Sequence, residues 1–274
     1  MSSYLKIAVE AAKIAGKIQK RHYGRVKHIQ FKSSSINLVT EVDKACEKAV
    51  LSHLKKRFPT YGLWGEESGQ ERKQSEYTWI VDPLDGTTNY AHAYPFFCVS
   101  IALLKGLQPV AGVVYDALRD ECFTAEKNEG AALNGKKILV SNISTLEKSL
   151  LSTGFSYGVR ETRYNLDNFT KMVLTAQGVR RDGSAALNLT YVAAGRMDGF
   201  WERYIEAWDM AAGILLVQEA GGRVTDITGK PFNLLSKNTL ATNGKIHKAL
   251  FDFLKKGPDE KKWARSHLRV GLRS

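Results

Sequence analysis

The sequence predicts a mixed α/β protein, with an α+β arrangement in its first half and a more regular α/β arrangement in its second. Apolar residues at helical spacing near the N-terminus indicate long helices there. Short apolar runs separated by turn residues follow them and predict neighbouring antiparallel strands. In the second half strand-like and helix-like segments alternate, which favours a more parallel sheet with helices on both faces.

Two helices are predicted in the first 58 residues. The first spans residues 3–22, because small and apolar side chains recur on one face and Gly24 ends the pattern. The side chains on that face are Leu5, Ala8, Ala12, Ala15 and Ile18. The second helix begins after Thr40, which acts as its N-cap, and Asp43 completes a capping box three residues later. Capping alone would account for Asp43.

The rest of the first half is predicted to consist mainly of strands. A short strand at 28–31 precedes a polar loop, and a second strand over 62–65 ends at Glu66 and Glu67. The charged segment from there to Tyr77 is typical of a loop. Glycine, aspartate and Asn-Gly turns separate four further strands and indicate hairpins. These strands are predicted at 97–104, 109–115, 121–125 and 137–140.

The second half alternates between strands and helices. Strands are predicted at 150–154, 179–181, 198–201, 223–226 and 240–242. Helices are predicted at 164–177, from a cap at 183–184 to 194, at 206–220 and at 245–256. The expected organisation is an N-terminal half at 1–145, a C-terminal half at 146–257 that packs with it into one compact unit, and a basic tail at 258–274.

The stretch 79–90, Trp-Ile-Val-Asp-Pro-Leu-Asp-Gly-Thr-Thr-Asn-Tyr, is the feature around which the predicted chemistry is organised. Its apolar start predicts a buried strand that stops at Asp82. Proline restricts the backbone and glycine frees it, so Asp82, Asp85 and main-chain groups can turn inward together. Such oxygen ligands suit Mg²⁺, and the amides of Gly86 and Thr87 suit a phosphate. A turn that only closes a strand is the alternative for the two aspartates alone.

Two other acidic positions are candidates of the same kind. Glu66 ends a predicted strand, although paired glutamates in a surface turn are common. Asp209 follows Trp208 near the start of an apolar helix, where a carboxylate often interacts only with the helix dipole. The same helix start would also present N–H groups and a carboxylate to a metal–phosphate complex. The residue types leave both interpretations open.

Composition limits the class of protein. Hydrophobic residues make up 43% of the chain and aromatic residues 10%, which is enough for a full core. No apolar run approaches the roughly 20 residues of a membrane span, and nothing resembles a signal peptide. Three widely spaced cysteines without a CxxC motif predict buried free thiols in a reducing compartment. They are Cys46, Cys98 and Cys122. We therefore expect a cytoplasmic protein without a membrane partner.

The formal net charge of +12 has three interpretations. A basic surface steers anionic small molecules towards a site, or it binds polyanions such as RNA without sequence preference. A solvated tail that does neither is the third. The segment from Lys255 to Ser274 carries seven Lys or Arg residues against Asp259 and Glu260.

In this order, the motifs resemble those of the inositol monophosphatase family. The segments that carry the resemblance are Gly65-Glu66-Glu67-Ser68, the stretch 79–90, Gly183-Ser184-Ala185-Ala186, Trp208-Asp209 and Glu219-Ala220-Gly221-Gly222. The resemblance runs from about residue 5 to about residue 255. It implies an αβαβα layered sandwich of the sugar-phosphatase type and a homodimer. It also implies Mg²⁺-dependent, Li⁺-sensitive hydrolysis of small phosphate monoesters, with two or three Mg²⁺ per subunit.

The resemblance also implies roles for individual residues. The ligands of the first metal correspond to Glu66, Asp82 and the carbonyl of Leu84, and Glu66 also corresponds to the contact with a third, weaker metal. The ligands of the second metal correspond to Asp82, Asp85 and Asp209, with Asp82 bridging the two metals.

Catalytic and substrate-binding roles carry over in the same way. Thr87 and Asp43 match the pair that orients and deprotonates the attacking water, and Glu66 belongs with them to the catalytic set. Gly86 and Thr87 match the phosphate-binding amides. The residues that match the alcohol side of the substrate site are Gly183, Ser184, Ala185 and Glu202, together with Asp85 and Asp209.

The sequence departs from the family pattern near the alcohol pocket. Relatives commonly have a small residue where this chain has Tyr204, and the acidic Glu206 is also unusual. We expect their bulk and charge to favour a monophosphate over a bisphosphate unless an arginine such as Arg180 or Arg203 covers the charge. The alternative is that Tyr204 and Glu206 point to solvent or to a dimer partner.

The predicted function is therefore hydrolysis of a small phosphate monoester, most simply myo-inositol monophosphate. Fructose-1,6-bisphosphate and 3′-phosphoadenosine 5′-phosphate are the alternative substrates, and the Thr88-Asn89-Tyr90 continuation resembles the inositol branch more than the nucleotide branch. An alternative of another class is a nucleic-acid or transcription-associated accessory protein that uses the basic surface. The complete set of metal ligands favours an enzyme.

Overall fold

The computed structural model describes residues 1–26, 28–32, 37–156, 159 and 165–255. The elements of the first half are α1 (Ser3–His22), β1 (Ile29–Phe31), β2 (Leu38–Thr40), α2 (Glu41–Arg57), β3 (Gly62–Gly65), β4 (Gly69–Glu71), β5 (Tyr77–Asp85), α3 (Thr87–Ala91), β6 (Cys98–Lys105), β7 (Gln108–Asp116), β8 (Glu121–Glu126), β9 (Gly130–Leu133) and β10 (Lys136–Lys137). Those of the second half are η1 (Leu146–Lys148), β11 (Leu150–Thr153), α5 (Leu166–Val173), β12 (Gly178–Arg180), α6 (Ala185–Ala193), β13 (Gly199–Arg203), α7 (Ala207–Glu219), β14 (Arg223–Thr225), β15 (Asn238–Thr242) and α8 (His247–Lys255).

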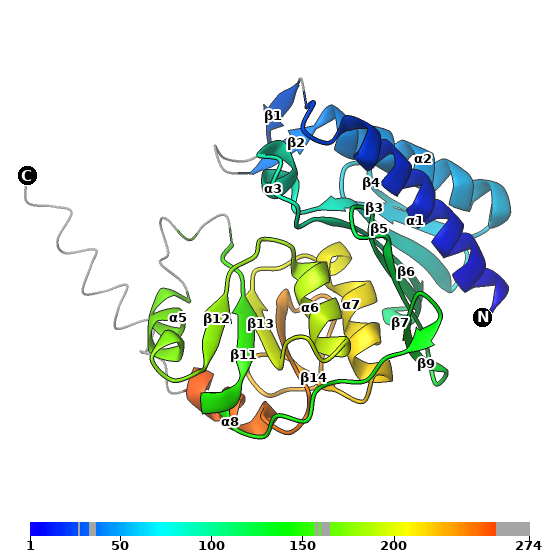
Figure 1. Ribbon diagram of the computed structural model, residues 1–274. Coiled ribbons are helices and arrows are strands. Elements are labelled where there is room, and N and C mark those ends of the chain that lie inside the picture. Colours follow the sequence, from blue (N-terminus) through cyan, green and yellow to red (C-terminus); the bar gives the residue numbers. More distant parts are fainter. Residues whose placement is uncertain (27, 33–36, 157–158, 160–164, 256–274) are drawn as a thin grey trace, which may run out of the picture.

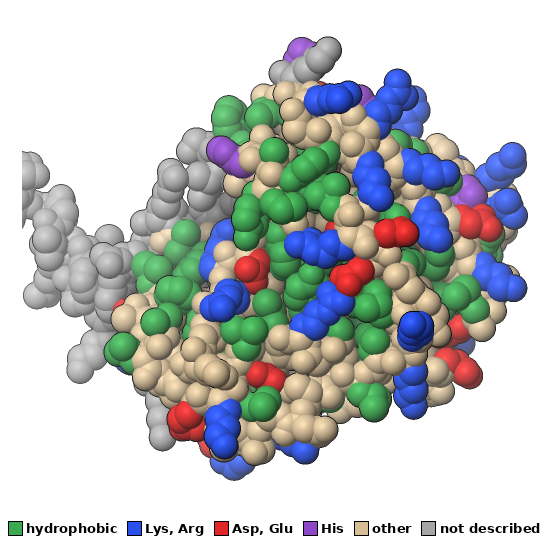
Figure 2. Space-filling view, viewed as in Figure 1, with side chains coloured by type: hydrophobic (Ala, Val, Ile, Leu, Met, Phe, Trp, Pro, Cys, Tyr) green, Lys and Arg blue, Asp and Glu red, His purple; other side chains and the backbone are tan. Residues whose placement is uncertain are grey.

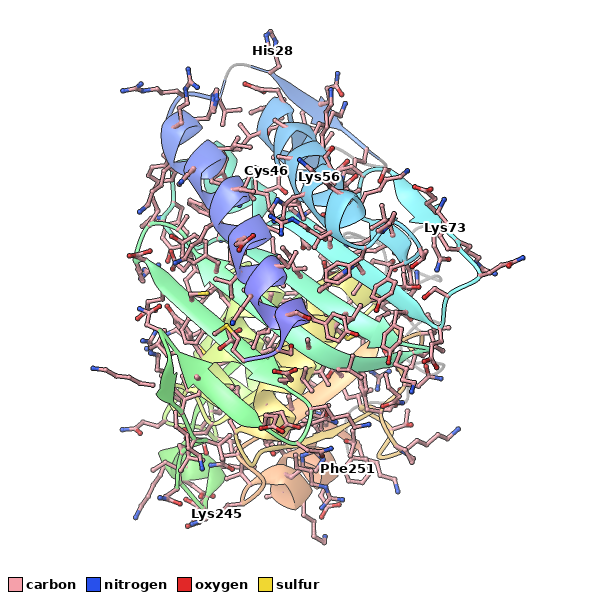
Figure 3. All side chains as sticks on the ribbon, turned by 90° about the vertical axis from the view of Figure 1, so that its right-hand side faces the viewer. His28, Cys46, Lys56, Lys73, Lys245 and Phe251 are labelled. Atoms are coloured by element: carbon pink, nitrogen blue, oxygen red, sulfur yellow. The ribbon has the colours of Figure 1, made fainter. Side chains whose placement is uncertain are left out.

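The described elements stack in five layers, which confirms the predicted αβαβα sandwich (Figure 1). Helices α1 and α2 lie side by side over one face of the first sheet (Figure 3). Helices α6 and α7 fill the space between the two sheets, and α5 and α8 lie along the outer side of the second sheet. Side chains from several of these elements can therefore form one site only at the edges where the layers meet.

The first sheet has eight strands in the order β10-β9-β8-β7-β6-β5-β3-β4, and its neighbours are antiparallel except for the parallel pair β3 and β5. The second sheet has the order β12-β11-β13-β15-β14. Strand β11 runs parallel to both of its neighbours, whereas β15 runs antiparallel to both of its own. The second half is thus a mixed sheet, only partly parallel.

The position of helix α7 between the two sheets explains why its sequence is apolar almost throughout. It packs against β5, β6 and β7 of the first sheet and against β14 of the second, so it has no broad face in water. Nine of its residues are buried. A helix that is covered on both sides needs apolar side chains all round. This placement brings the N-terminal end of α7, and Asp209 with it, to the end of β5.

Some element predictions were wrong in detail. Strand β5 continues through Asp82 to Asp85 instead of stopping at the proline. Strands β2, β4 and β9 were not predicted, because strands of three or four residues are too short to show a clear alternation. The strand expected over 137–140 is reduced to β10, and the helix expected over 164–177 ends at Val173. Part of the latter and the basic tail lie outside the described residues.

The three cysteines are buried free thiols, as predicted. Within the described ranges, the helices are all too short or too polar to cross a bilayer.

Candidate active site

A bulge in β5 turns the first acidic residues into the site. The register of β5 against β6 shifts between Asp82 and Asp85, where Pro83 has no N–H to give to the ladder. The N–H of Leu84 donates to Asp82 Oδ1 (3.0 Å), and the carbonyl of Leu84 accepts a hydrogen bond from Thr87 Oγ1 (3.1 Å). The bulge therefore gathers a carboxylate, a carbonyl and a hydroxyl within six residues.

Asp85 links this bulge to the second half of the chain. Its Oδ2 accepts hydrogen bonds from Ser184 Oγ (2.7 Å) and from the N–H of Ala186 (2.6 Å). Ser184 is the N-cap of α6 and also accepts a hydrogen bond from the N–H of Leu187. The predicted substrate residues at 183–185 thus lie beside the predicted metal ligand Asp85.

The N-terminal end of α7 supplies the third aspartate. Asp209 Oδ2 accepts a hydrogen bond from the N–H of Glu206 (2.9 Å), which closes a capping box at the start of the helix. One carboxylate oxygen from each of Asp82, Asp85 and Asp209 lies within 4.8 Å of the other two. Residues 124 positions apart are therefore brought to a spacing that one cation or a pair of cations can bridge.

The electrostatics of this cluster fit a divalent cation. Asp82 is buried, and burial together with the charges of Glu66, Asp85 and Asp209 raises its pKa well above the ordinary value. Burial likewise raises the pKa of Asp85 to about 6, against the opposing hydrogen bonds from α6. Carboxylates that are buried close together repel one another, so binding of a cation between them is favourable. A set of ligands made only of oxygen atoms suits a hard cation such as Mg²⁺.

Thr87 and Asp43 come together as the family resemblance implies. Thr87 Oγ1 lies 2.9 Å from Asp43 Oδ1, while Asp43 Oδ2 accepts hydrogen bonds from the N–H and the hydroxyl of Thr40. The two oxygens of Asp43 thus have separate partners: one belongs to the capping box of α2, and the other contacts Thr87. Burial raises the pKa of Asp43, although the hydrogen bonds from Thr40 and Thr87 act in the opposite direction.

Glu66 lies in the turn between β3 and β4, and its side chain lines the same cavity. Lys32 Nζ lies 2.8 Å from Glu66 Oε1 and also binds Glu67. Burial raises the pKa of Glu66 to about 7, and the charge of Lys32 opposes that rise. Glu66 is not within the tight group of three aspartates, but it faces Asp82 closely enough to raise the pKa of that residue.

The groups surround a cavity of about 410 Å³. Gly86 lies at its edge as the N-cap of α3, with φ of +98°, and a Cβ there would lie 2.9 Å from the carbonyl oxygen of Phe96. Glycine is needed at this position on both grounds. The N–H groups of the first turn of a helix have no partners inside that helix, so Gly86 and Thr87 offer amides next to the aspartates.

The alcohol side of the cavity contains Glu202, at the end of β13. Its carboxylate lies directly against Gly154, where any Cβ would overlap it. Burial raises the pKa of Glu202 to about 8, and Arg181, which lines the same cavity, acts in the opposite direction. Ser184, Gly183 and Ala185 line this side as well.

The two residues that depart from the family pattern also border the cavity. Tyr204 has φ of +59°, and the residue is 56% exposed. Glu206 forms an ion pair with Lys237 (2.7 Å). Lys237 is thus a cation paired with Glu206 that was not considered from the sequence, where Arg180 and Arg203 were the candidates. Glu206 itself borders the pocket, as that hypothesis required.

Three cationic residues at or next to the site were not identified from the sequence: Lys32 and Arg181, which line the cavity, and Lys237, which pairs with the lining residue Glu206. Each lies in a loop or at a strand end, without a motif around it. Arg181 was visible only as part of a short basic cluster with Arg180. Single charged residues that reach a site from separate loops leave no spacing signal in a sequence.

Comparison with known proteins places this arrangement in a family. The model of the inositol monophosphatase family matches residues 1–256. An inositol-1-monophosphatase from Synechocystis is 46% identical over 94% of this chain and 91% of its own. Nus factor SuhB from Pseudomonas aeruginosa is 44% identical over 91% of this chain and 95% of its own.

The solved structures agree with this. The inositol monophosphatase from Anabaena (Nostoc) superimposes with a TM-score of 0.86 at 45% identity, covering 95% of this chain and 98% of that one. The match therefore extends over the fold, both halves of the site and the motifs that join them. The chain belongs to the inositol monophosphatase family and is an enzyme, a phosphatase of the hydrolase class.

Proposed function

We propose that this phosphatase hydrolyses myo-inositol monophosphate to inositol and phosphate and that Mg²⁺ is its cofactor. The observation that carries the proposal is the convergence of Asp82, Asp85 and Asp209 beside the amides of Gly86 and Thr87 in one cavity. A small phosphate monoester fits a site of about 410 Å³ that has acidic residues for a cation at one end and hydrogen-bonding groups for an alcohol at the other.

The residues that would hold Mg²⁺ are Glu66, Asp82, the carbonyl of Leu84, Asp85 and Asp209, for two or three ions. Bound Mg²⁺ neutralises the phosphate, lowers the pKa of water and stabilises the leaving oxygen. Phosphoryl transfer otherwise needs mainly positioning and fixed electrostatics. The amides of Gly86 and Thr87 would position the phosphate, and no covalent nucleophile is required.

The chain supplies its own route for the proton of the attacking water. Thr87 Oγ1 can accept that proton while its own hydrogen passes to Asp43 Oδ1, 2.9 Å away. The raised pKa of Asp43 suits a carboxylate that must take up a proton transiently. The bonds from Thr40 hold the other oxygen of Asp43 in place during the transfer.

A phosphate-release screen over sugar, polyol and nucleotide phosphates tests the substrate and the cofactor together. We expect release from inositol monophosphate in Mg²⁺, loss of release after chelation, and inhibition by Li⁺ in the millimolar range. Readdition of Mg²⁺ to the chelated enzyme is the control. Full activity after exhaustive chelation would contradict the metal proposal. Preference for fructose-1,6-bisphosphate or 3′-phosphoadenosine 5′-phosphate would replace the proposed substrate and keep the chemistry.

The ion pair between Glu206 and Lys237, which borders the cavity, determines how strongly we expect the enzyme to prefer monophosphates over bisphosphates. Because Lys237 pairs with Glu206, Glu206→Gln leaves the positive charge of Lys237 uncovered and should lower the ratio of kcat/KM for inositol 1-phosphate over fructose-1,6-bisphosphate, by about threefold at most for an exposed pair. Lys237→Gln leaves the charge of Glu206 uncovered and should lower kcat/KM for the bisphosphate more than for the monophosphate. Lys230→Gln, which replaces an exposed lysine outside the Glu206–Lys237 pair, is the control. Equal losses for both substrates in Lys237→Gln would contradict this reasoning.

A second candidate function comes from the basic charge and from the relatives named Nus factor SuhB. Lysine and arginine side chains are spread over the face shown in Figure 2, with acidic residues among them. Interaction with RNA through this surface would fall steeply as salt rises, because counterions are released on binding. Retention of RNA that disappears between about 50 and 200 mM salt would support it; no retention at low salt would exclude it.

We also propose that the chain forms a homodimer, resides in the cytoplasm and divides near residue 145 into two halves of one unit. Light scattering of the purified protein tests the dimer directly: a mass of twice 30.5 kDa is expected, and a mass of one chain would contradict it.

A further inference from the structure

Helix α2 carries a second buried carboxylate one turn after Asp43. Asp43 and Glu47 are four residues apart and therefore lie on the same face of the helix. Glu47 is 3% exposed. Its Oε2 accepts a hydrogen bond from the N–H of Glu67 (2.8 Å), and its Oε1 accepts one from the N–H of Ser68 (2.8 Å). Both oxygens of one buried carboxylate are thus used to hold two successive amides of a single turn.

A carboxylate is the side chain that this arrangement requires. Two neighbouring N–H groups that point in one direction form a concave site for an anion, and hydrogen bonds to an ionised group are the stronger ones. Glutamine offers one acceptor and one NH₂ donor, so it cannot accept from both amides. Gly65 completes the fit, because a Cβ there would lie 2.5 Å from Glu47 Oε2. The carboxylate rests against the bare backbone of the turn.

The same turn carries Glu66. The N–H of Glu66 donates to the carbonyl of Val81 on β5 (3.1 Å), so the residue is fixed on one side by the sheet and on the other by Glu47. The side chain of Glu66 lines the active-site cavity, whereas Glu47 lines a separate groove on the other side of the turn. Glu47 therefore determines where the Glu66 carboxylate lies without reaching the cavity itself.

We propose that Glu47 is a positioning residue for the divalent cation: it holds the turn 65–68 so that Glu66 faces the aspartate cluster. This inference rests on the proposed Mg²⁺-dependent function. One face of α2 thus fixes the positions of two segments of the first half. Asp43 contacts Thr87, and Glu47 holds the turn that carries Glu66. The partners that orient metal ligands typically contribute 10- to 100-fold in metal affinity.

The test compares the Mg²⁺ affinity of Glu47→Gln with that of the wild type, measured by calorimetric titration of the substrate-free enzyme. We expect the affinity to fall by about tenfold or more. In assays, kcat should return to within about threefold of the wild type at saturating Mg²⁺, since Glu47 does not line the active-site cavity. Glu71→Gln is the matched control, because Glu71 is a carboxylate on the adjacent strand β4 that pairs with the exposed side chains of Lys55 and Lys73. That variant should bind Mg²⁺ as the wild type does.

Unchanged Mg²⁺ affinity in Glu47→Gln would overturn the inference. A loss of kcat that saturating Mg²⁺ does not restore would overturn it as well. A wild-type enzyme that neither binds nor needs Mg²⁺ would instead overturn the proposed function, so the two failures are distinguishable.

Gly65→Ala provides an independent variant that keeps the carboxylate. The backbone of Gly65 does not have a positive φ, so alanine fits the chain conformation, but its Cβ must push the Glu47 carboxylate off the turn. The same weakening of Mg²⁺ binding is expected. If Glu47→Gln does not fold, which circular dichroism would show, Gly65→Ala decides the question, and wild-type affinity in that variant would overturn the inference.

Discussion

Replacement of Asp82 or of Asp209 by asparagine is expected to lower kcat for phosphate release by at least about a thousandfold, while the fold stays intact. Both carboxylates belong to the group whose oxygens lie within 4.8 Å of one another. An amide keeps the local hydrogen bonds, since its oxygen can still accept from the N–H of Leu84 or of Glu206. It removes the charge that a cation needs, so the charge that develops on the phosphate is left uncompensated.

The same substitutions should stabilise the protein when it is kept in a chelator. Folding raises the pKa of Asp82, through burial and the charges of its neighbours. A carboxyl group with a raised pKa destabilises the folded state as pH rises through its ordinary range and above, because it is then ionised more easily in the unfolded chain. The neutral amide removes this cost, so the Tm at pH 7 should rise in Asp82→Asn without Mg²⁺. Addition of Mg²⁺ should raise the Tm of the wild type but not that of the variant.

Asp252→Asn is the control for charge, because Asp252 lies on α8 and pairs with Lys248, far along the chain from the site. It should retain wild-type activity and the wild-type response of Tm to Mg²⁺. Activity within tenfold of the wild type in Asp82→Asn or Asp209→Asn at saturating Mg²⁺ would contradict the metal assignment.

Replacement of Thr87 by valine has the second largest expected effect, a loss of about 10²- to 10⁴-fold in kcat. Valine has nearly the same shape, but it cannot relay a proton to Asp43 Oδ1 or donate to the carbonyl of Leu84. The measurement is the steady-state kcat for inositol 1-phosphate at saturating Mg²⁺. The affinity for Mg²⁺ should change much less than kcat, because the carboxylates remain.

Thr87→Ser keeps the hydroxyl and should recover most of the activity, whereas Asp43→Asn should resemble the valine variant. Asparagine at 43 would present either an oxygen or an NH₂ to Thr87, and neither can take up the proton. Two outcomes argue against the relay: a kcat of Thr87→Val near that of the wild type, or equal losses in the serine and valine variants. The second would point to a packing role for the threonine methyl group.

Long periodic elements were predicted well from the sequence, and short or distorted ones were not. Helices α1, α2, α6 and α7 follow from apolar spacing and from caps at Thr40 and Ser184. Strand β5 was predicted too short because Asp-Pro normally ends a strand. The chain instead tolerates the proline as a bulge and resumes pairing at Asp85. The bulge is a tertiary effect, since β6 must be present to pair on both sides of it.

The residues of the site were likewise predictable in part only. Motif residues such as Asp82, Asp85 and Thr87 are close in sequence, so their proximity could be argued from spacing alone. The joining of Asp209 to them depends on how α7 packs between two sheets. The residue types left a role for Asp209 at a metal–phosphate complex open, and the family resemblance favoured that role. Glu47 had no signal at all, because a glutamate on a helix that carries many charges is indistinguishable from a solvated one until its burial is known.

The most direct test of the metal-dependent mechanism is an anomalous difference map from crystals soaked in Mn²⁺, which takes the same oxygen ligands as Mg²⁺. We predict a peak among the carboxylates of Asp82, Asp85 and Asp209, with a further peak towards Glu66, and loss or weakening of the first peak in Asp209→Asn. A map without a peak between these carboxylates, from crystals of a wild-type enzyme that releases phosphate in the same Mn²⁺ solution, would contradict the central claim.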